Sequence, residues 1–364
     1  MSAPRNPNAP FAAPKAASRI ASTDSHYTAA VIPTTILAVL AQLADTEGVA
    51  VEPWLAGFGI TRAQIDDASV RVSYRQANII IKRAQRAISR PGLGLQVGAR
   101  QSTGTFGIMG LAMMTARTFG EAIRIGIEHA EISGALMDVE FEQPSAHEVA
   151  LIARPRFAED EILTFLCEEL FASTLQLARG LVGPAFKPER LELTYPAPAH
   201  AADYRKQFDC EIRFGASRNR LIVAARWLNE RLATHHPVSA QQALALCRDQ
   251  AAQIKRQSEI VAAVERILRH RLAERPSFGD IAASLNLSER TLRRHLSAVG
   301  RIYREMHDQL RTERALELLS AGALSIADIG SEVGYSDARE FRRAFKRWTG
   351  RSPTNARSTG VSTD

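Results

Sequence analysis

The sequence predicts two units of different fold class: an α+β unit, mostly helical with a small sheet, followed by an all-α unit with two helix-turn-helix motifs. Three observations predict this division. Residues 281–353 contain the same apolar and capping pattern twice. Before residue 235, short alternating strands lie among longer helical patterns, which is typical of a mixed α and β unit. The positive charge is concentrated in the last third of the chain.

The charge distribution separates the two units. The chain has 364 residues and a net charge of +7. From Ala251 onward there are 20 Lys or Arg and 14 Asp or Glu, so this part carries +6 and the first 250 residues carry +1. A positive field confined to one unit is typical of a nucleic-acid-binding domain joined to a nearly neutral one. Apolar residues make up 45% of the chain, which is enough for buried cores in both.

Several function classes are excluded by what the sequence lacks. Its three cysteines are widely spaced, which argues against a disulfide framework or a zinc site and indicates a reducing compartment. No histidine has ligand spacing and no nucleophile motif is visible, so we expect no catalytic residue, no metal and no cofactor. Glu168 and Glu169 are helical neighbours that point in different directions, so they should not act as a carboxylate pair. No signal peptide or membrane-spanning run is visible, and we expect a cytoplasmic protein associated with the nucleoid.

The repeated pattern begins with a short apolar helix. Its inward positions are Ile281, Ala282 and Leu285 in the first copy, and Ile326, Ile329 and Val333 in the second. A turn follows at Asn286 and at Gly334, two residue types that tolerate a left-handed backbone. Ser288 in the first copy, and Ser336 or Asp337 in the second, can then cap the next helix.

The second helix of each copy has an apolar inward face and a basic outward face. Its inward residues are Leu292 and Leu296 in the first copy, and Phe341, Phe345 and Trp348 in the second. Its outward residues are Arg290, Arg293 and Arg294, and then Arg339, Arg342, Arg343, Lys346 and Arg347. Residues 304–319 predict one long helix that joins the copies and spans about 24 Å. We therefore expect two recognition helices in successive major grooves, about 34 Å apart.

Residues 314–319, 325–337 and 341–353 resemble the C-terminal signature of AraC/XylS-type bacterial transcription regulators. The resemblance covers the last third of the chain and implies a seven-helix DNA-binding domain that regulates promoters. It implies base contacts by Arg290, Arg293, Arg294, Arg339, Arg342 and Arg343, and we add Ser336 and Lys346 to the predicted DNA-binding set. Two roles stay open for each arginine, reading a base or holding phosphate, since both contacts are usual for arginine. The segment 297–301 is one residue shorter than the commonest family form.

The first unit should contain both helices and strands. Helices are expected at 34–44, around 54–67, and at 74–88, 119–131, 162–181 and 202–208, and strands at 136–142, 148–154, 190–195, 211–214 and 220–224. Two glycine-spaced segments, 91–98 and 104–110, imitate phosphate loops. Neither follows a convincing strand or ends in Lys-Ser/Thr, so close helix packing is favoured over a nucleotide site.

Residues 92–95, 106–110, 195–198 and 204–216 resemble the N-terminal sensor domain of an AraC-family subgroup that includes the ornithine-utilisation regulator and a mycobacterial virulence regulator. The resemblance spans roughly residues 36–232. It implies an effector-sensing or dimerising domain that is not the cupin barrel of the arabinose regulator. The effector and its binding residues cannot be identified from the sequence. Four arginines here could hold an anionic effector, although plain surface solvation is favoured: Arg205, Arg213, Arg218 and Arg220.

These observations predict a disordered tail (1–26), an effector-sensing or dimerisation domain (27–234), a linker (235–257), a double helix-turn-helix DNA-binding domain (258–357) and a second disordered tail (358–364). The linker should hold a helix at 239–253, and a separate helix near 260 should open the DNA-binding domain.

The expected function is that of a sequence-specific transcription factor, classed as an activator, that responds to a small-molecule effector. The expected partners are double-stranded promoter DNA, RNA polymerase, the effector and a second copy of the chain in a homodimer, with no membrane. An alternative is an effector-independent regulator whose N-terminal domain only dimerises. The rival classes are an enzyme with a DNA-binding appendage and a purely architectural DNA binder.

Overall fold

The computed structural model describes residues 27, 30, 32–58, 60–67, 70–157 and 160–359. The chain forms two compact units, Met1–Ile254 (the first unit) and Lys255–Asp364 (the second unit). The first unit contains helices and strands and the second is helical, which confirms the predicted fold classes. Both predicted tails lie mainly outside the described residues, but helix α18 continues to Thr359, two residues into the predicted tail at 358–364.

A five-stranded sheet of order β3-β4-β7-β5-β6 organises the first unit. Its strands are β3 (Met137–Glu142), β4 (Glu148–Pro155), β5 (Arg190–Leu193), β6 (Glu211–Phe214) and β7 (Asn219–Ala224). Neighbouring strands are antiparallel except β5 and β6, which are parallel. In β3, acidic residues alternate with Met137, Val139 and Phe141, so each kind faces its own side of the sheet. The sheet therefore has one apolar face and one charged face.

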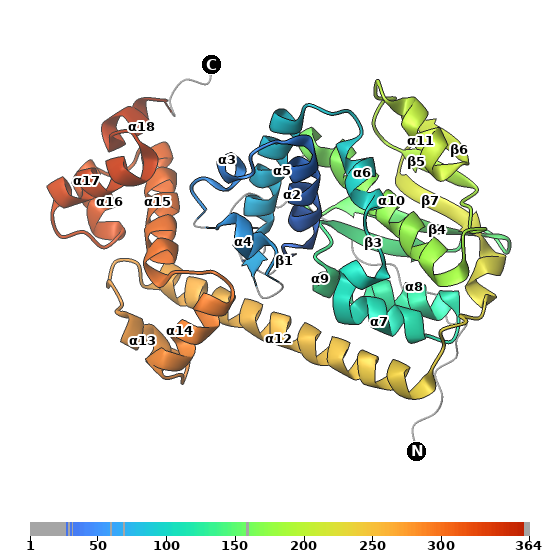
Figure 1. The fold of residues 1–364 in the computed structure, drawn as a ribbon. Coiled ribbons are helices and arrows are strands. Elements are labelled where there is room, and N and C mark those ends of the chain that lie inside the picture. Colours follow the sequence, from blue (N-terminus) through green and yellow to red (C-terminus); the bar gives the residue numbers. More distant parts are fainter. Residues whose placement is uncertain are drawn as a thin grey trace. The chain divides into compact units, whose positions relative to one another are not determined.

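The first unit also contains helices, some of which pack against the apolar face of this sheet. The helices are α2 (Thr35–Glu47), α3 (Glu52–Leu55), α4 (Arg62–Ile65), α5 (Tyr74–Ile88), α6 (Leu93–Ala99), α7 (Gly107–Thr115), α8 (Phe119–Glu128), α9 (Ala130–Ser133), α10 (Leu163–Val182) and α11 (Ala201–Phe208). Of these, α7, α8 and α10 pack against the apolar face. Short 3-10 turns lie at Thr103–Phe106, Asp160–Ile162 and Ala225–Asn229, and β1 (Ile32–Pro33) pairs with β2 (Arg71–Val72). Helix α10 lies across the strands (Figure 1) and buries Phe165, Phe171 and Leu175 in the same core as Leu191 and Leu221. It is the central helix that its nearly continuous apolar sequence predicts.

The glycine-spaced segments pack helices together, as predicted. A Cβ atom on Gly94 would lie 2.5 Å from the carbonyl oxygen of Phe165, and one on Gly98 would lie 2.5 Å from that of Glu169. Both contacts join α6 to α10. Gly110 in α7 is tighter still, since its Cβ would lie 1.8 Å from the carbonyl oxygen of Thr103. These glycines allow close backbone approach, so a phosphate site is not needed to explain them.

Helix α12 (Pro237–His270) begins in the first unit and ends in the second. It contains the predicted helix at 239–253 and the predicted opening helix near 260 without a break. No glycine or proline occurs between Val238 and Arg275, so no helix-breaking residue lies between the two predicted helices. Ala243 and Cys247 are buried in the core of the first unit, and part of the predicted linker therefore belongs to that unit.

The second unit consists of the end of α12, α13 (Phe278–Ser284), α14 (Glu289–Ala298), α15 (Tyr303–Ala321), α16 (Ile326–Glu332), α17 (Ala338–Thr349) and α18 (Pro353–Thr359). Helix α15 is the long helix predicted at 304–319, and it runs from the α13–α14 pair to the α16–α18 group (Figure 1). Ala315 and Leu319 of α15 form a buried cluster with Ile329, Phe341 and Phe345. Helix α15 is thus a shared support within this unit.

Candidate nucleic-acid interface

Helices α13 and α14 form the first motif, and local side-chain contacts define both of its helices. Ser277 and Asp280 cap α13 reciprocally, since each side chain accepts a hydrogen bond from the other's backbone N–H. Asn286 then has a φ of +54°, the left-handed conformation that the sequence predicts at this turn. Ser288 caps α14 by accepting a hydrogen bond from the backbone N–H of Thr291 at 3.2 Å. Leu292 and Leu296 are buried, so the opposite side of α14 faces solvent.

Helices α16 and α17 form the second motif and repeat this plan. Ser325 and Asp328 form the capping box of α16, and the turn residue Gly334 has a φ of +83°. The sequence leaves Ser336 or Asp337 as the cap of α17, and the structure has Asp337, which accepts a hydrogen bond from the backbone N–H of Arg339 at 2.7 Å. The first helices of the two motifs each have seven residues and the same type of cap. The internal repeat that the sequence suggests is therefore a structural repeat.

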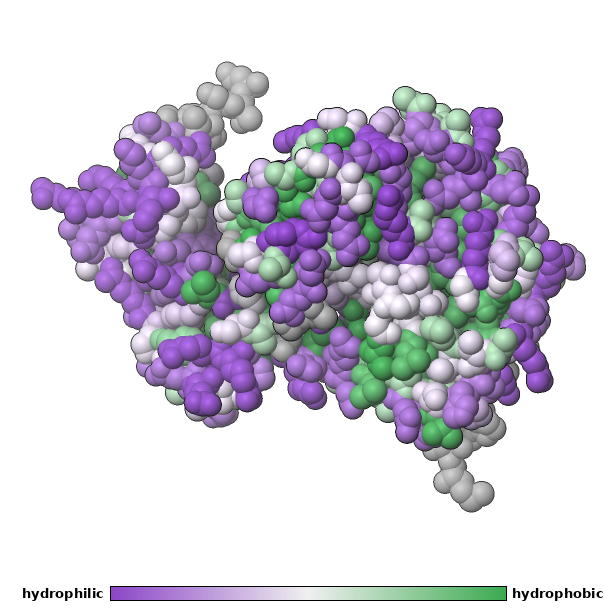
Figure 2. Space-filling model, in the orientation of Figure 1, coloured by the Kyte–Doolittle hydropathy of each residue, from purple (hydrophilic) through white to green (hydrophobic). Residues whose placement is uncertain are grey.

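The eight residues predicted to bind DNA are all exposed: Arg290, Arg293, Arg294, Ser336, Arg339, Arg342, Arg343 and Lys346. The first three lie on α14, Ser336 lies just before α17, and the other four lie on α17. Within the part of the chain that the structure describes, six of the seven cationic side chains make no ion pair; Arg293 is the exception. Figure 2 shows hydrophilic side chains projecting from the surface over α16 and α17. Each motif therefore presents concentrated positive charge that its own fold does not neutralise.

Arg293 is held by two neighbours on the first motif. Its guanidinium lies 5.2 Å from the centre of the Phe278 ring, and its Nη2 lies 3.9 Å from Oε2 of Glu289. Both groups restrain the side chain without burying it. Glu289 could either orient an arginine or accept a hydrogen bond from a cytosine, and this contact favours orientation. The corresponding Glu340 of the second motif has no ion pair within the described residues.

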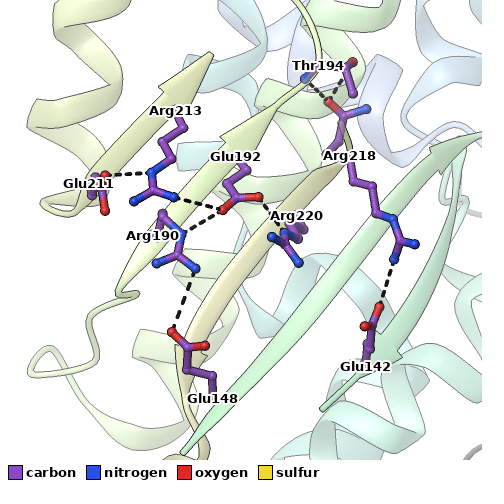
Figure 3. Close-up of polar contacts among 10 residues, drawn as sticks. Glu142, Glu148, Arg190, Glu192, Thr194, Glu211, Arg213, Arg218 and Arg220 are labelled. Atoms are coloured by element: carbon purple, nitrogen blue, oxygen red, sulfur yellow. Dashed lines mark hydrogen bonds and ion pairs between the residues drawn. The ribbon is translucent and has the colours of Figure 1, made fainter. Parts of the chain in front are cut away.

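The arginines of the first unit are arranged differently, on the charged face of the sheet (Figure 3). Glu192 is 5% exposed and receives hydrogen bonds from Arg190 at 2.8 Å and Arg220 at 2.6 Å. Burial raises the pKa of Glu192, but these two arginines outweigh burial and lower it overall. Arg213 pairs with Glu211 at 2.7 Å, and Arg218 with Glu142 at 3.0 Å. Arg213, Arg218 and Arg220 thus already have carboxylate partners, which does not favour an anionic effector there. The fourth arginine of the set, Arg205, is exposed on α11, as surface solvation would have it.

Three contacts that stabilise the second unit could not be found from sequence spacing. Tyr335 follows the turn of the second motif, and the guanidinium groups of Arg275 and Arg311 each lie 5.2 Å from its ring centre. Arg301 donates a hydrogen bond to the buried Glu265 at 2.8 Å, although burial still raises the pKa of this carboxyl. No local pattern links residues so far apart in the chain.

The short segment at 297–301 ends α14 cleanly. Val299 follows the last residue of α14, and Gly300 has a φ of +63°. The backbone N–H of Arg301 then donates to the carbonyl oxygen of Leu296 at 2.8 Å. Helix α15 begins two residues later, at Tyr303. The start of the linking helix, which the shortened segment left open, is thereby fixed.

The fold and these two surfaces define a DNA-binding protein with paired helix-turn-helix motifs. Residues 281–359 match a helix-turn-helix domain family, and residues 48–232 match the family described as the arabinose-binding domain of AraC transcription regulators, N-terminal. The chain belongs to the AraC family of transcription regulators. Its matched domains and relatives are regulators and not enzymes. Although the first unit matches the arabinose-binding family, its main sheet is a five-stranded sheet of order β3-β4-β7-β5-β6.

Relatives in Pseudomonas aeruginosa are similar along most of the chain. The ornithine utilization regulator is 28% identical over 334 residues, which cover 91% of this chain and 98% of that protein. The regulator VqsM is 27% identical over 274 residues, which cover 73% of this chain and 83% of that one. The crystal structure of CdpR from the same organism aligns with 85% of this chain and 96% of its own, at 23% identity and a TM-score of 0.44.

Two further findings concern membranes and metals. Among the described residues, no helix combines the length and the apolar run that crossing a bilayer requires. The same residues contain no group of three or more His, Cys, Asp or Glu side chains placed to hold a metal ion.

Proposed function

We propose that this regulator binds promoter DNA sequence-specifically through α14 and α17, and that its first unit responds to a small-molecule effector. The six arginines of the two helices contact bases or phosphates, and Ser336 and Lys346 contact the backbone beside them. We further propose that it acts as an activator that contacts RNA polymerase, as a homodimer at the nucleoid in the cytoplasm.

The unpaired cations of α14 and α17 are the observation that supports this proposal most directly. An arginine that already has a carboxylate partner must lose that partner before it can bind phosphate or a base edge. Of the seven cations, only Arg293 has an ion pair within the described residues, and at 3.9 Å that pair is long. Ser288 and Asp337, the caps of the two helices, are both exposed. Both helices are therefore ready to bind DNA without rearrangement.

The test is selection of bound sequences from a random DNA pool by the full chain, followed by affinity measurement on the selected site and on scrambled DNA. We expect one defined motif, with binding about a thousandfold or more tighter than to scrambled DNA. Affinity for both should fall steeply with salt because phosphate contacts release counterions. Equal affinity for selected and scrambled DNA would instead show a purely architectural DNA binder.

A second candidate, in which the first unit only dimerises, has one supporting observation. Leu111 on α7 is 46% exposed, and Figure 2 shows apolar surface over that helix. Exposed apolar patches often mark protein contacts. Sedimentation of the full chain, with and without the DNA site, separates the two candidates. The second function is supported if the chain dimerises and if a cellular metabolite extract changes neither the dimerisation nor the DNA affinity.

A further inference from the structure

A largely apolar cavity of about 140 Å³ lies inside the first unit. Helices α7, α8 and α10 form three of its walls, and the apolar face of β3, β4 and β7 forms another. Met109, Met113, Phe119, Ile123 and Leu177 are among the side chains that line it. It lies on the opposite side of the sheet from the arginine and glutamate network of Figure 3. It is therefore unrelated to any anion-binding role of those arginines.

Glu169 is the one ionisable side chain among the residues that line this cavity. It is 6% exposed and accepts a hydrogen bond from Nε2 of Gln101 at 2.5 Å. Gln101 is 3% exposed, and its own Oε1 has no hydrogen-bond partner within the described residues. The lining hydroxyls of Ser133 and Ser173 already donate to the carbonyl oxygens of Ala130 and Leu170. Glu169 is thus the one charged group that the lining of this cavity presents, beside hydroxyls whose hydrogens are already bonded within the protein.

The carboxylate of Glu169 accepts the hydrogen bond of the buried Gln101 amide, and the same side chain lines an apolar space. The backbone of Glu169 is fixed by the close approach of Gly98. A neutral side chain could accept the same hydrogen bond without desolvating a charge. The neighbouring Glu168 differs, because its Oε1 accepts from the phenol of Tyr204 at 2.6 Å and contacts the imidazole of His200 at 2.5 Å, and it does not line the cavity. Of the two adjacent glutamates, Glu169 is the one placed to meet a ligand in this cavity.

We propose that the cavity binds a small apolar amine, whose hydrocarbon part is enclosed by the methionine, phenylalanine and aliphatic side chains and whose ammonium group is held by the carboxylate of Glu169. An ammonium supplies N–H donors and a positive charge, which match the carboxylate of Glu169. An apolar cavity of about 150 Å³ holds benzene, so the ligand should be about the size of one six-membered ring with a short side arm.

The electrostatics of Glu169 support the same ligand charge. Burial raises the pKa of this carboxyl to about 7, although the hydrogen bond from Gln101 opposes the rise. A cationic ligand would favour the ionised form and draw the pKa back down, whereas an anionic ligand would oppose ionisation. Binding of the amine should therefore strengthen as the pH rises from about 6 to 8.

The inference rests on the proposed effector response of the first unit, and it is tested by direct binding to the full chain. Benzylamine, toluene and benzoate have nearly the same shape and differ in charge, so they are titrated in parallel by calorimetry or by ligand-observed NMR. We expect benzylamine to bind at least about tenfold more tightly than toluene, and benzoate not to bind. Tighter binding of benzoate, equal binding of all three, or binding of none would overturn the proposal.

Three variants locate the site. Glu169→Gln keeps the shape of the side chain and should abolish the preference for benzylamine over toluene. Ala178→Leu adds volume to the cavity wall and should weaken both ligands. Glu128→Gln removes a carboxyl from an exposed position of α8 and is the matched control, which should bind like the wild type. An unchanged preference in a folded Glu169→Gln protein would place the amine elsewhere and refute the assignment.

DNA affinity is measured on the same samples without any probe. If the probes fail to bind while sequence-specific DNA binding persists, the amine site is wrong and the proposed DNA-binding function stands. If benzylamine binds but no DNA motif is selected, the proposed function is wrong and the cavity assignment stands.

Discussion

The two helix-turn-helix motifs share one backbone plan but are stabilised in different ways. In the second motif, Gly334 lies against the backbone of Leu272, and the adjacent Tyr335 is held between Arg275 and Arg311. In the first motif, the turn residue Asn286 is exposed. The arginines on the outward faces differ in the opposite sense. The first motif restrains Arg293 by an ion pair and a ring contact. Within the described residues, no ion pair restrains the corresponding arginines of the second motif, Arg339, Arg342 and Arg343. A repeat in sequence therefore does not imply equal stability or equal preparation for binding.

The turn residues should show the largest difference between the motifs. A Cβ on Gly334 would lie 2.4 Å from the carbonyl oxygen of Leu272, and its φ of +83° disfavours a side chain. Gly334→Ala should therefore destabilise the second motif by about 3 kcal/mol or more. Asn286→Ala keeps the left-handed strain but meets no such contact, and should cost about 1 kcal/mol. Hydrogen exchange of peptides from α16–α17 and from α13–α14 measures the loss of local stability in each variant. Equal losses of stability in the two variants would contradict the expected difference between the motifs.

As the pH falls, the first motif should lose stability before the second. Burial, helped by the positive charge of Arg311, lowers the pKa of His307 on α15 to about 4. Since the folded pKa lies below that of the unfolded chain, the stabilisation is complete above pH 6.5 and is lost as the pH falls toward 4, by up to about 3 kcal/mol. His307 contacts Tyr303, whose ring packs on Phe278 of the first motif. His307→Leu should flatten this pH dependence, measured as thermal stability from pH 7 to pH 4.

Single base contacts should have intermediate effects. Arg342→Ala and Arg293→Ala should each weaken binding to the selected site by about 1–3 kcal/mol and relax specificity at one position. The structural control is Arg314→Ala, an exposed arginine on α15 that pairs with Glu317 and should leave affinity nearly unchanged. Affinity is measured on selected and scrambled DNA. A residue whose loss weakens both equally holds phosphate and does not read sequence.

The glutamates beside the arginines should have the smallest effects. Glu289→Gln removes one of the two restraints on Arg293, so DNA binding should weaken by less than about 1 kcal/mol, with the loss confined to the selected site. Glu340→Gln in the second motif removes no ion pair found in the described residues and should raise affinity slightly, because it removes negative charge. Identical effects of the two variants would show that Glu289 does not position Arg293.

Local signals in the sequence were enough to predict most of the helices and the plan of the interface. The capping serines, the left-handed turn residues and the apolar spacing act within a few positions of one another, so Ser288, Asn286 and Gly334 could be recognised directly. The same is true of strands β3 and β6, whose alternation of residue types is short and regular. The exposure of all eight predicted DNA-binding residues follows from the burial of their apolar neighbours.

Features that depend on distant residues could not be predicted. The attachment of the start of helix α12 to the first unit depends on contacts of Ala243 and Cys247 with other elements, which spacing does not reveal. The clamp on Tyr335 joins three segments of the chain. The cavity around Glu169 is formed by helices and strands that are up to nearly two hundred positions apart, from Ile36 to Val223. In the sequence, Glu169 is simply one of two adjacent glutamates on a helix.

The proposed function requires both recognition helices to bind the same stretch of DNA. Hydroxyl-radical footprinting of the full chain on its selected site tests this directly. We expect two protected patches about one helical turn, or 34 Å, apart. Alanine at Arg290, Arg293 and Arg294 should remove one patch, and alanine at Arg339, Arg342 and Arg343 should remove the other. One patch with the unaltered protein, or loss of the same patch in both triple variants, would contradict it.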